Sequence, residues 1–143
     1  AHIEMAARHD LPLQIHDRDA HEDSIALLRE CALPDQRIVF HCFSGDAQMA
    51  DILAENGWYA SFAGPISYPA NDNLRRAFAV LPPELVLVET DAPYLTPVPW
   101  RGCPNASYVM AYTVRFMAEL WGVPEQLACV RLTENTERVY GSW

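Results

Sequence analysis

The sequence predicts an α/β fold in which about four parallel strands alternate with helices. Short apolar runs of strand length recur along the chain, and each is followed by a stretch with apolar residues at helical spacing. The most hydrophobic run, Leu85-Val-Leu-Val88, is continuous and rich in β-branched residues, as expected for a strand covered on both faces. This alternation is typical of a parallel sheet with helical crossovers.

The expected elements follow from these runs in chain order. The strands are expected over residues 11–15, 37–40, 57–62 and 85–88. Helices are expected over residues 19–31, 46–55, 71–80 and, after a proline-rich loop, 109–120. A final pair of helices is expected after Pro124, with Thr133 as an N-cap and Gly141 as the stop.

The N-terminal residues 1–10 have the pattern of a helix already under way, and the first residue is Ala1. We therefore expect a single partial domain over residues 1–143 that lacks preceding strands. The alternative is a short domain that begins with a helix. Either way, the length is sufficient for one hydrophobic core.

Composition limits the function classes. Ten Lys and Arg against nineteen Asp and Glu give a net charge of −9, which excludes a broad basic surface for nucleic acid. A phosphate substrate must then meet metal ions and a few placed arginines. The four cysteines have no CxxC spacing, so we expect reduced, part-buried thiols in a cytoplasmic protein. No apolar run reaches the ~18–20 residues that span a bilayer, so no membrane partner is expected.

Three residues with metal-ligating side chains stand at the ends of expected strands: His16, His41 and Asp91. His16 and His41 are 25 residues apart, about one β/α unit, and Asp91 follows 50 residues later. The carboxyl ends of parallel strands form the floor of the active site in such folds. Imidazole and carboxylate ligands without a thiolate suit Mg, Mn or Zn acting as a Lewis acid.

Each residue also has a simpler explanation. A histidine at a strand end is often a hydrogen-bonded structural residue, and Asp91 can cap the turn at Asp-Ala-Pro. Three such coincidences at equivalent positions are less probable than one shared site. We therefore predict a divalent-metal site.

Several motifs make the chain resemble the TatD family of metal-dependent deoxyribonucleases and hydrolases. The matching segments, in the family's order, are Leu13-Gln-Ile-His-Asp-Arg18, Phe40-His-Cys-Phe-Ser-Gly45, Glu89-Thr-Asp-Ala-Pro-Tyr-Leu95, Arg101-Gly102 with Asn105, and Thr133-Glu-Asn135. The resemblance implies the second half of a TIM-type (β/α)8 barrel, strands five to eight, with the N-terminal strands missing. The family's His-x-His pair and middle-strand Glu ligand are not in this sequence.

The resemblance also implies an activity. His16, His41 and Asp91 would be metal ligands, and the complete protein would hold two divalent ions. The substrate would be DNA or another phosphodiester, hydrolysed by metal-activated water. Asp91 would be the catalytic residue that steers the proton of that water.

Other residues are weaker candidates for the same site. Arg18 and Arg101 can hold substrate phosphates bidentately, with a surface ion pair or loop tie as the alternative. Glu89 can orient a metal ligand. Three aromatic side chains are candidates for stacking on bases, with core or loop packing as the alternative: Trp58, Tyr94 and Trp100.

Two alternatives to a deoxyribonuclease stay open. One is a related barrel hydrolase that cleaves an ester or amide bond, for example on an aminoacylated nucleic acid. The other is a non-catalytic half-barrel. Four parallel strands leave open edges and an uncovered interior face, so we expect the chain to need its missing N-terminal half or to self-associate.

Overall fold

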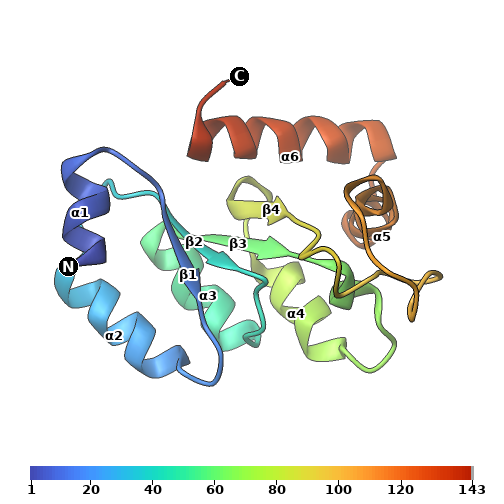
Figure 1. Ribbon diagram of the computed structural model, residues 1–143, viewed down its shortest axis with the longest axis horizontal. Helices are drawn as coiled ribbons and strands as arrows, with labels where there is room; N and C mark the ends of the chain where they lie inside the picture. Colours follow the sequence, from blue (N-terminus) through green and yellow to red (C-terminus); the bar gives the residue numbers. More distant parts are fainter. Residues whose placement is uncertain (143) are drawn as a thin grey trace.

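The computed structural model describes residues 1–142 and contains one four-stranded parallel sheet with helices on both sides (Figure 1). The strands pair in chain order and are β1 (Leu13–His16), β2 (Ile38–His41), β3 (Tyr59–Phe62) and β4 (Val86–Val88). The predicted α/β fold is therefore confirmed. β1 starts two residues later than expected because Pro12 has no N–H to donate, and Leu13 makes the first ladder bond, to Arg37 at 2.8 Å.

In the part of the chain that the structure describes, six α-helices flank the sheet. They are α1 (His2–Arg8), α2 (His21–Cys31), α3 (Ala47–Asn56), α4 (Asp72–Val80), α5 (Met110–Trp121) and α6 (Glu125–Tyr140). Short 3-10 turns lie at η1 (Gly64–Ser67), η2 (Pro83–Leu85) and η3 (Ser107–Val109). Helices α2, α3 and α4 each connect one strand to the next. Within residues 1–142, no helix has the length and apolar character needed to cross a membrane.

The main core lies between the sheet and the connecting helices. Phe40 and Phe62 point from the strands toward Leu53 of α3 and Phe78 of α4, and all four side chains are at most 1% exposed. The rings of Phe62 and Phe78 meet edge to face, with centroids 5.2 Å apart. Burying each such side chain stabilises the fold by about 1.5–3 kcal/mol relative to exposure. This packing holds the strand ends in place.

The opposite face of the sheet is covered by α6, which lies across it from the connecting helices (Figure 1). Because strand side chains alternate between faces, Val39, Tyr59 and Leu87 point to this side and pack on Val139 of α6. The expectation of an uncovered interior face is therefore wrong for β2, β3 and β4. It holds for β1, where Gln14 is exposed. Self-association of the chain stays a prediction.

The C-terminal segment differs from the expected pair of helices. α6 is one continuous helix from Glu125 to Tyr140, and Thr133 lies in its interior instead of capping a second helix. The buried positions Ala128, Leu132, Asn135 and Val139 repeat at helical spacing, so no break is needed. The amide of buried Asn135 donates to the carbonyls of Pro83 and Val86, at 2.7 and 2.8 Å, which ties α6 to the start of β4. Gly141 follows the helix at φ 86°, as expected for the stop.

Candidate active site

Two predicted ligands come from neighbouring strand ends. His16 and His41 are the last residues of β1 and β2, and they are partners in the parallel register. Their ring centroids are 5.5 Å apart. Parallel pairing thus brings the two imidazoles to one edge of the sheet, where the sequence analysis expected them. His16 is exposed, whereas only 19% of the His41 side chain is accessible.

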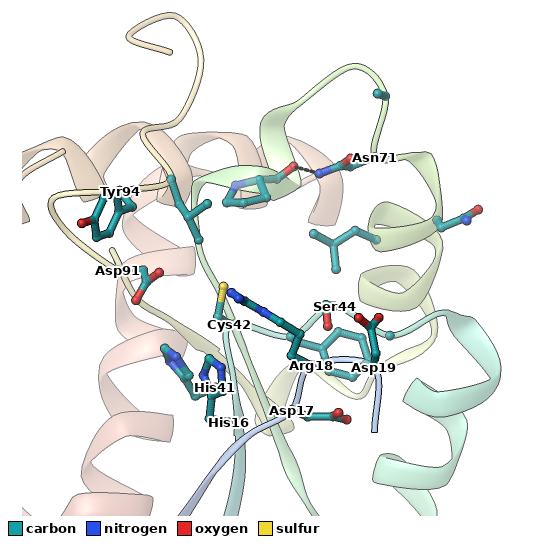
Figure 2. Close-up of a pocket in the computed structure, with 17 residues that line it drawn as sticks. His16, Asp17, Arg18, Asp19, His41, Cys42, Ser44, Asn71, Asp91 and Tyr94 are labelled. Atoms are coloured by element: carbon teal, nitrogen blue, oxygen red, sulfur yellow. Dashed lines mark hydrogen bonds between the residues drawn. The ribbon is translucent and has the colours of Figure 1, made fainter. Parts of the chain in front are cut away.

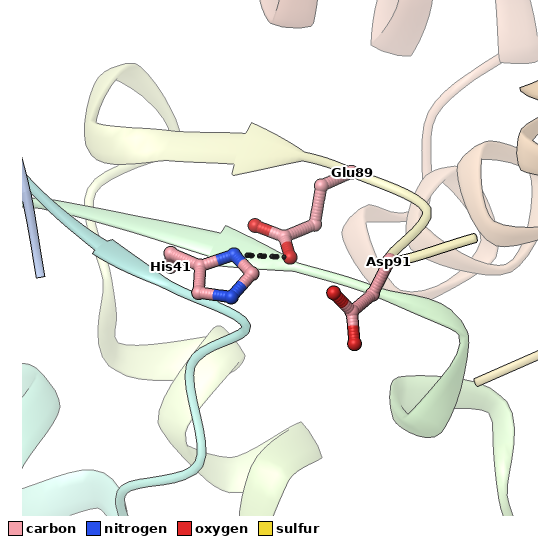
Figure 3. Close-up of side chains that lie close together, drawn as sticks. All are labelled: His41, Glu89 and Asp91. Atoms are coloured by element: carbon pink, nitrogen blue, oxygen red, sulfur yellow. Dashed lines mark ion pairs between the residues drawn. The ribbon is translucent and has the colours of Figure 1, made fainter. Parts of the chain in front are cut away.

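The carboxylates of Glu89 and Asp91 reach the same edge of the sheet from the segment that follows β4. The N–H of Glu89 donates to the carbonyl of Phe62 at 3.0 Å, which extends the ladder by one residue and brings Glu89 beside His41. Ligand atoms of His41, Glu89 and Asp91 all lie within 4.8 Å of one another (Figure 3). Among the described residues, the compact group of possible metal ligands therefore consists of His41, Glu89 and Asp91. His16 lies outside this group, next to His41.

Glu89 has contacts to two neighbouring residues. Its Oε1 lies 2.8 Å from Nδ1 of His41, and its Oε2 accepts the backbone N–H of Cys42 at 3.0 Å. Oε1 is buried, and no aligned hydrogen bond reaches it from any residue in 1–142. A buried carboxylate oxygen without a donor favours a nearby cation. The nitrogen and oxygen donors of this group suit a divalent ion such as Zn, Mn or Mg, so the residues fit the expected metal.

A cavity of about 780 Å³ opens in front of this group (Figure 2). His16, His41 and Asp91 line it together with Arg18 and Tyr94. Arg18 is exposed and forms no ion pair with a carboxylate of residues 1–142. Its guanidinium extends across the cavity toward Cys42 (Figure 2). The cavity thus combines an arginine without an ion pair to the described residues with candidate metal ligands.

The turn that carries Arg18 is fixed by Asp17, which the sequence analysis did not single out. One carboxylate oxygen of Asp17 accepts the N–H of Ala20 at 3.2 Å, and the other lies 2.5 Å from Nδ1 of His21. The spacing of four residues between Asp17 and His21, across the start of α2, is the sequence signal that indicates this pair.

The loop that carries Asp91 and Tyr94 is fixed by buried Asn105. Its side-chain amide donates to the carbonyls of Thr90 and Tyr94, both at 2.7 Å, and its N–H donates to Pro93 at 3.0 Å. Asn105 belongs to one of the motifs that the chain shares with the TatD family, but the sequence alone predicts no role for it. A side-chain amide that satisfies two loop carbonyls holds the loop in one conformation.

The aromatic candidates differ in their surroundings. Trp58 is 5% exposed in the core, so packing explains it, whereas Tyr94 is 71% exposed at the cavity. Trp100 is partly exposed and packs edge to face on Tyr112, with centroids 5.9 Å apart. Only Tyr94 of the three therefore lines the cavity and is available to stack on a bound base.

Arg101 is placed differently from Arg18. Its guanidinium lies over the ring of Tyr68, 4.4 Å from the centroid, and it is not among the residues that line the cavity. The Tyr68 hydroxyl donates to the carbonyl of Thr96 at 3.0 Å. Tyr68, which directly follows η1, is therefore linked to the loop after β4 through both Thr96 and Arg101. This geometry is that of a loop tie, and phosphate binding by Arg101 stays a prediction.

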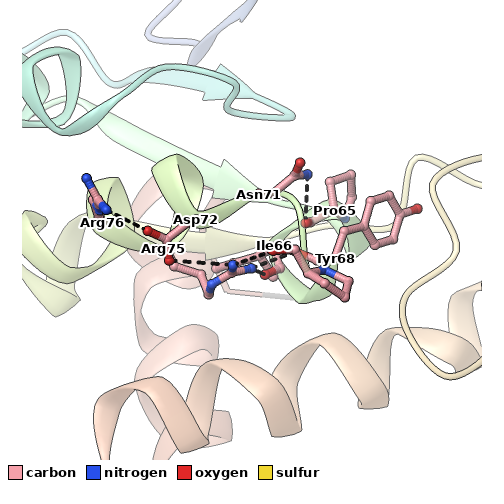
Figure 4. A network of polar contacts seen from close by, with 8 residues as sticks. Pro65, Ile66, Tyr68, Asn71, Asp72, Arg75 and Arg76 are labelled. Atoms are coloured by element: carbon pink, nitrogen blue, oxygen red, sulfur yellow. Dashed lines mark hydrogen bonds and ion pairs between the residues drawn. The ribbon is translucent and has the colours of Figure 1, made fainter.

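Arg75 supports the far wall of the cavity. Its guanidinium donates to the carbonyls of Ile66, Tyr68 and Pro69, at 3.3, 2.7 and 2.9 Å (Figure 4). The amide of Asn71, which lines the cavity, donates to Pro65 at 3.0 Å. These bonds hold the segment between β3 and α4, so the wall opposite Asp91 is also fixed.

The fold and site together define a parallel α/β half-barrel with a candidate metal centre at the carboxyl edge of its strands. The chain belongs to the family described as TatD related DNase, whose family model matches residues 1–141. It is 45% identical over 141 residues to the uncharacterized metal-dependent hydrolase TatD of Mycobacterium tuberculosis, covering 98% of this chain and 53% of that protein. It is 39% identical over 140 residues to the uncharacterized metal-dependent hydrolase YcfH of Escherichia coli, covering 97% and 52%.

Solved structures show the same architecture. The TatD homolog YJJV of Escherichia coli superposes with a TM-score of 0.90 at 30% identity, covering 99% of this chain and 54% of that one. A TatD family hydrolase of Entamoeba histolytica, at 16% identity and a TM-score of 0.84, supports the fold alone. The predicted family and fold class are confirmed. The chain spans about half the length of the relatives that it matches.

The cysteines differ in accessibility and reactivity. Cys31, Cys103 and Cys129 are exposed free thiols, not part-buried as predicted, and Cys42 is partly buried. Burial, followed by the negative charges of Glu89 and Asp91, raises the pKa of Cys42 from 9.0 to about 11. A raised pKa means that the neutral thiol stabilises the fold below about pH 9, and that this contribution is lost as pH rises toward 11.

We therefore expect iodoacetamide to alkylate Cys42 at about pH 9 much more slowly than the three exposed cysteines. Compared with a thiol of the ordinary pKa 9.0, a thiol with a pKa of about 11 has roughly fiftyfold less thiolate at this pH, and thiolate is the reactive form. Peptide mapping by mass spectrometry over a time course measures each rate. The variant Cys42→Ser serves as control, since the rates at the other three sites should not change. Equal rates at Cys42 and Cys31 would contradict the described environment.

Proposed function

We propose that this chain carries part of the active site of a metal-dependent hydrolase that cleaves phosphodiester bonds of DNA. The observation that carries the proposal is Arg18, a guanidinium without an ion pair to residues 1–142, in the same cavity as His41 and Asp91. The family description, TatD related DNase, and the metal-dependent hydrolases among the relatives support the same class of reaction. A site that pairs metal ligands with an arginine suits a phosphate substrate.

His41 and Asp91 would hold a divalent ion, with His16 available from the adjacent strand. When bound, such an ion supplies Lewis acidity that stabilises the negative charge developing on the phosphate. His41 lies mostly buried at the base of the cavity, and Asp91 is exposed in the loop above it. The two donors therefore approach the site from β2 and from the loop after β4.

Arg18 would bind the phosphate that is to be cleaved. The chain carries a net charge of −9, so long-range attraction cannot recruit a nucleic acid, and a cation inside the cavity must supply the contact. A guanidinium offers two parallel N–H donors that match two phosphate oxygens. Its turn is held by Asp17, which limits the entropy lost on binding.

Asp91 would accept a proton from the attacking water. Its carboxylate is exposed to the cavity, and the backbone at φ 54° lies in the left-handed region, which few residues other than glycine adopt. Strained backbone of this kind is found preferentially at functional sites. Exposed Tyr94, in the same loop, would stack on a base next to the cleaved bond.

Replacement Asp91→Asn is expected to lower the rate of DNA cleavage at least a hundredfold and to leave the fold intact. The side chain is exposed, so its replacement removes a proton acceptor and an anionic ligand without altering the core. Nucleotide release from single-stranded DNA, with Mg, Mn or Zn and with EDTA as a control, measures the rate, and circular dichroism measures the fold. Near-normal cleavage by the variant would contradict this role. Hydrolysis of an aminoacyl ester with DNA left intact would favour the ester hydrolase alternative.

Replacement Arg18→Ala is expected to raise KM for DNA roughly ten- to hundredfold with a smaller change in kcat, because a charge-assisted hydrogen bond is worth about 1.5–3 kcal/mol. Arg18→Lys should recover part of the loss, since it keeps the charge without the bidentate geometry. Arg8, exposed on α1 at the other end of the sheet, provides the matched control Arg8→Ala. An equal effect of both alanine variants would show that only net charge matters.

A further inference from the structure

We propose that Glu89 is a positioning residue that sets the tautomer and orientation of His41. The inference rests on the proposed metal-binding role of His41. Both carboxylate oxygens of Glu89 already have neighbours at the end of β2 and just after it. Oε1 lies 2.8 Å from Nδ1 of His41, and Oε2 accepts the N–H of Cys42 at 3.0 Å (Figure 3).

The contact to Cys42 accounts for an unusual backbone conformation. Cys42 has φ 46°, in the left-handed region that disfavours side chains larger than glycine. Such conformations persist where surrounding groups hold them. The bond from the Cys42 N–H to Oε2 is such a restraint, and it joins the turn after β2 to the residue after β4. One carboxylate therefore fixes both the backbone that follows His41 and the ring of His41.

The short distance places Glu89 in direct contact with the ring of His41. Nδ1 and Oε1 are 2.8 Å apart, which is the usual length of a hydrogen bond between a ring N–H and a carboxylate. Oε1 lacks an aligned hydrogen bond, but the terminal torsion of histidine is soft, and a small ring rotation brings an Nδ1–H into line with it.

The chemical consequence concerns the other ring nitrogen. Neutral imidazole carries one proton, so a proton held on Nδ1 by Glu89 leaves the lone pair on Nε2. A carboxylate that accepts the proton of a ligating histidine both fixes the ring and makes it a stronger donor. Glu89 would thus prepare His41 to bind a cation through Nε2 before any cation arrives.

The test is the tautomer of His41 in metal-free, ¹⁵N-labelled protein at about pH 8.5, where free imidazole is neutral. Long-range ¹H–¹⁵N correlation spectra distinguish the two tautomers. We expect the Nδ1–H form in the unmodified chain and a shift to the Nε2–H form in Glu89→Gln, because the amide can accept from Cys42 and then donates to Nδ1. Affinity for Zn, measured by calorimetry, should fall roughly ten- to hundredfold in that variant.

The control is Glu84→Gln, the same chemical change at an exposed residue, which should alter neither measurement. An Nε2–H tautomer in the unmodified chain, or an Nδ1–H tautomer that persists in Glu89→Gln, would overturn the proposal. The measurement on the unmodified chain decides the matter even if Glu89→Gln does not fold. Since it needs neither metal nor DNA, its outcome is independent of whether the chain cleaves phosphodiesters.

Discussion

Parallel pairing brings the last residue of every strand to the same edge of the sheet, and the chemistry of this chain is concentrated at that edge. The register that pairs His16 with His41 places two imidazoles side by side without any contribution from the loops. The ladder bond from Glu89 to Phe62 then continues the sheet by one residue and brings a carboxylate to His41. An antiparallel strand at any of these positions would have sent its terminal residue to the opposite edge.

The rest of the molecule keeps that edge rigid. Aromatic packing between the strands and α3 and α4 fixes the strands from one side, and α6 fixes β2, β3 and β4 from the other. Each loop that carries a candidate residue is then tied by one buried or partly buried polar side chain. Asp17 holds the turn of Arg18, and Asn105 holds the loop of Asp91. Such support matters because binding sites lose function when donors shift by fractions of an ångström.

The sequence predicted the parts of the fold that depend on local patterns. Apolar runs located the four strands, and the residues that follow them located His16, His41 and Asp91. The close approach of Glu89 to His41 could not be predicted from spacing alone, because it depends on β4 continuing its ladder past Val88. Thr133 was misread as an N-cap because Asn135, a polar residue, occupies a buried position and interrupts the apolar pattern of α6.

The two candidate arginines also differ in a way that local sequence patterns cannot predict. The sequence makes both Arg18 and Arg101 candidate phosphate ligands and favours Arg18 slightly, because it follows His16 by two residues. The structure separates them through contacts between distant segments: Arg101 stacks on Tyr68, 33 residues earlier in the chain, whereas Arg18 faces the cavity. Side-chain partners that depend on tertiary packing are not encoded in local spacing, and they decide which residues remain available to a ligand.

A metal centre at this edge of the sheet is tested most directly by asking whether His41 binds a divalent ion. Calorimetric titration of Zn or Mn into the metal-free chain, with native mass spectrometry to count bound ions, measures affinity and stoichiometry. We expect a bound ion in the unmodified chain, affinity at least tenfold lower in His41→Ala, and no change in His9→Ala, which removes an exposed histidine after α1. The absence of binding, or equal affinity in both variants, would contradict a metal centre at this edge of the sheet.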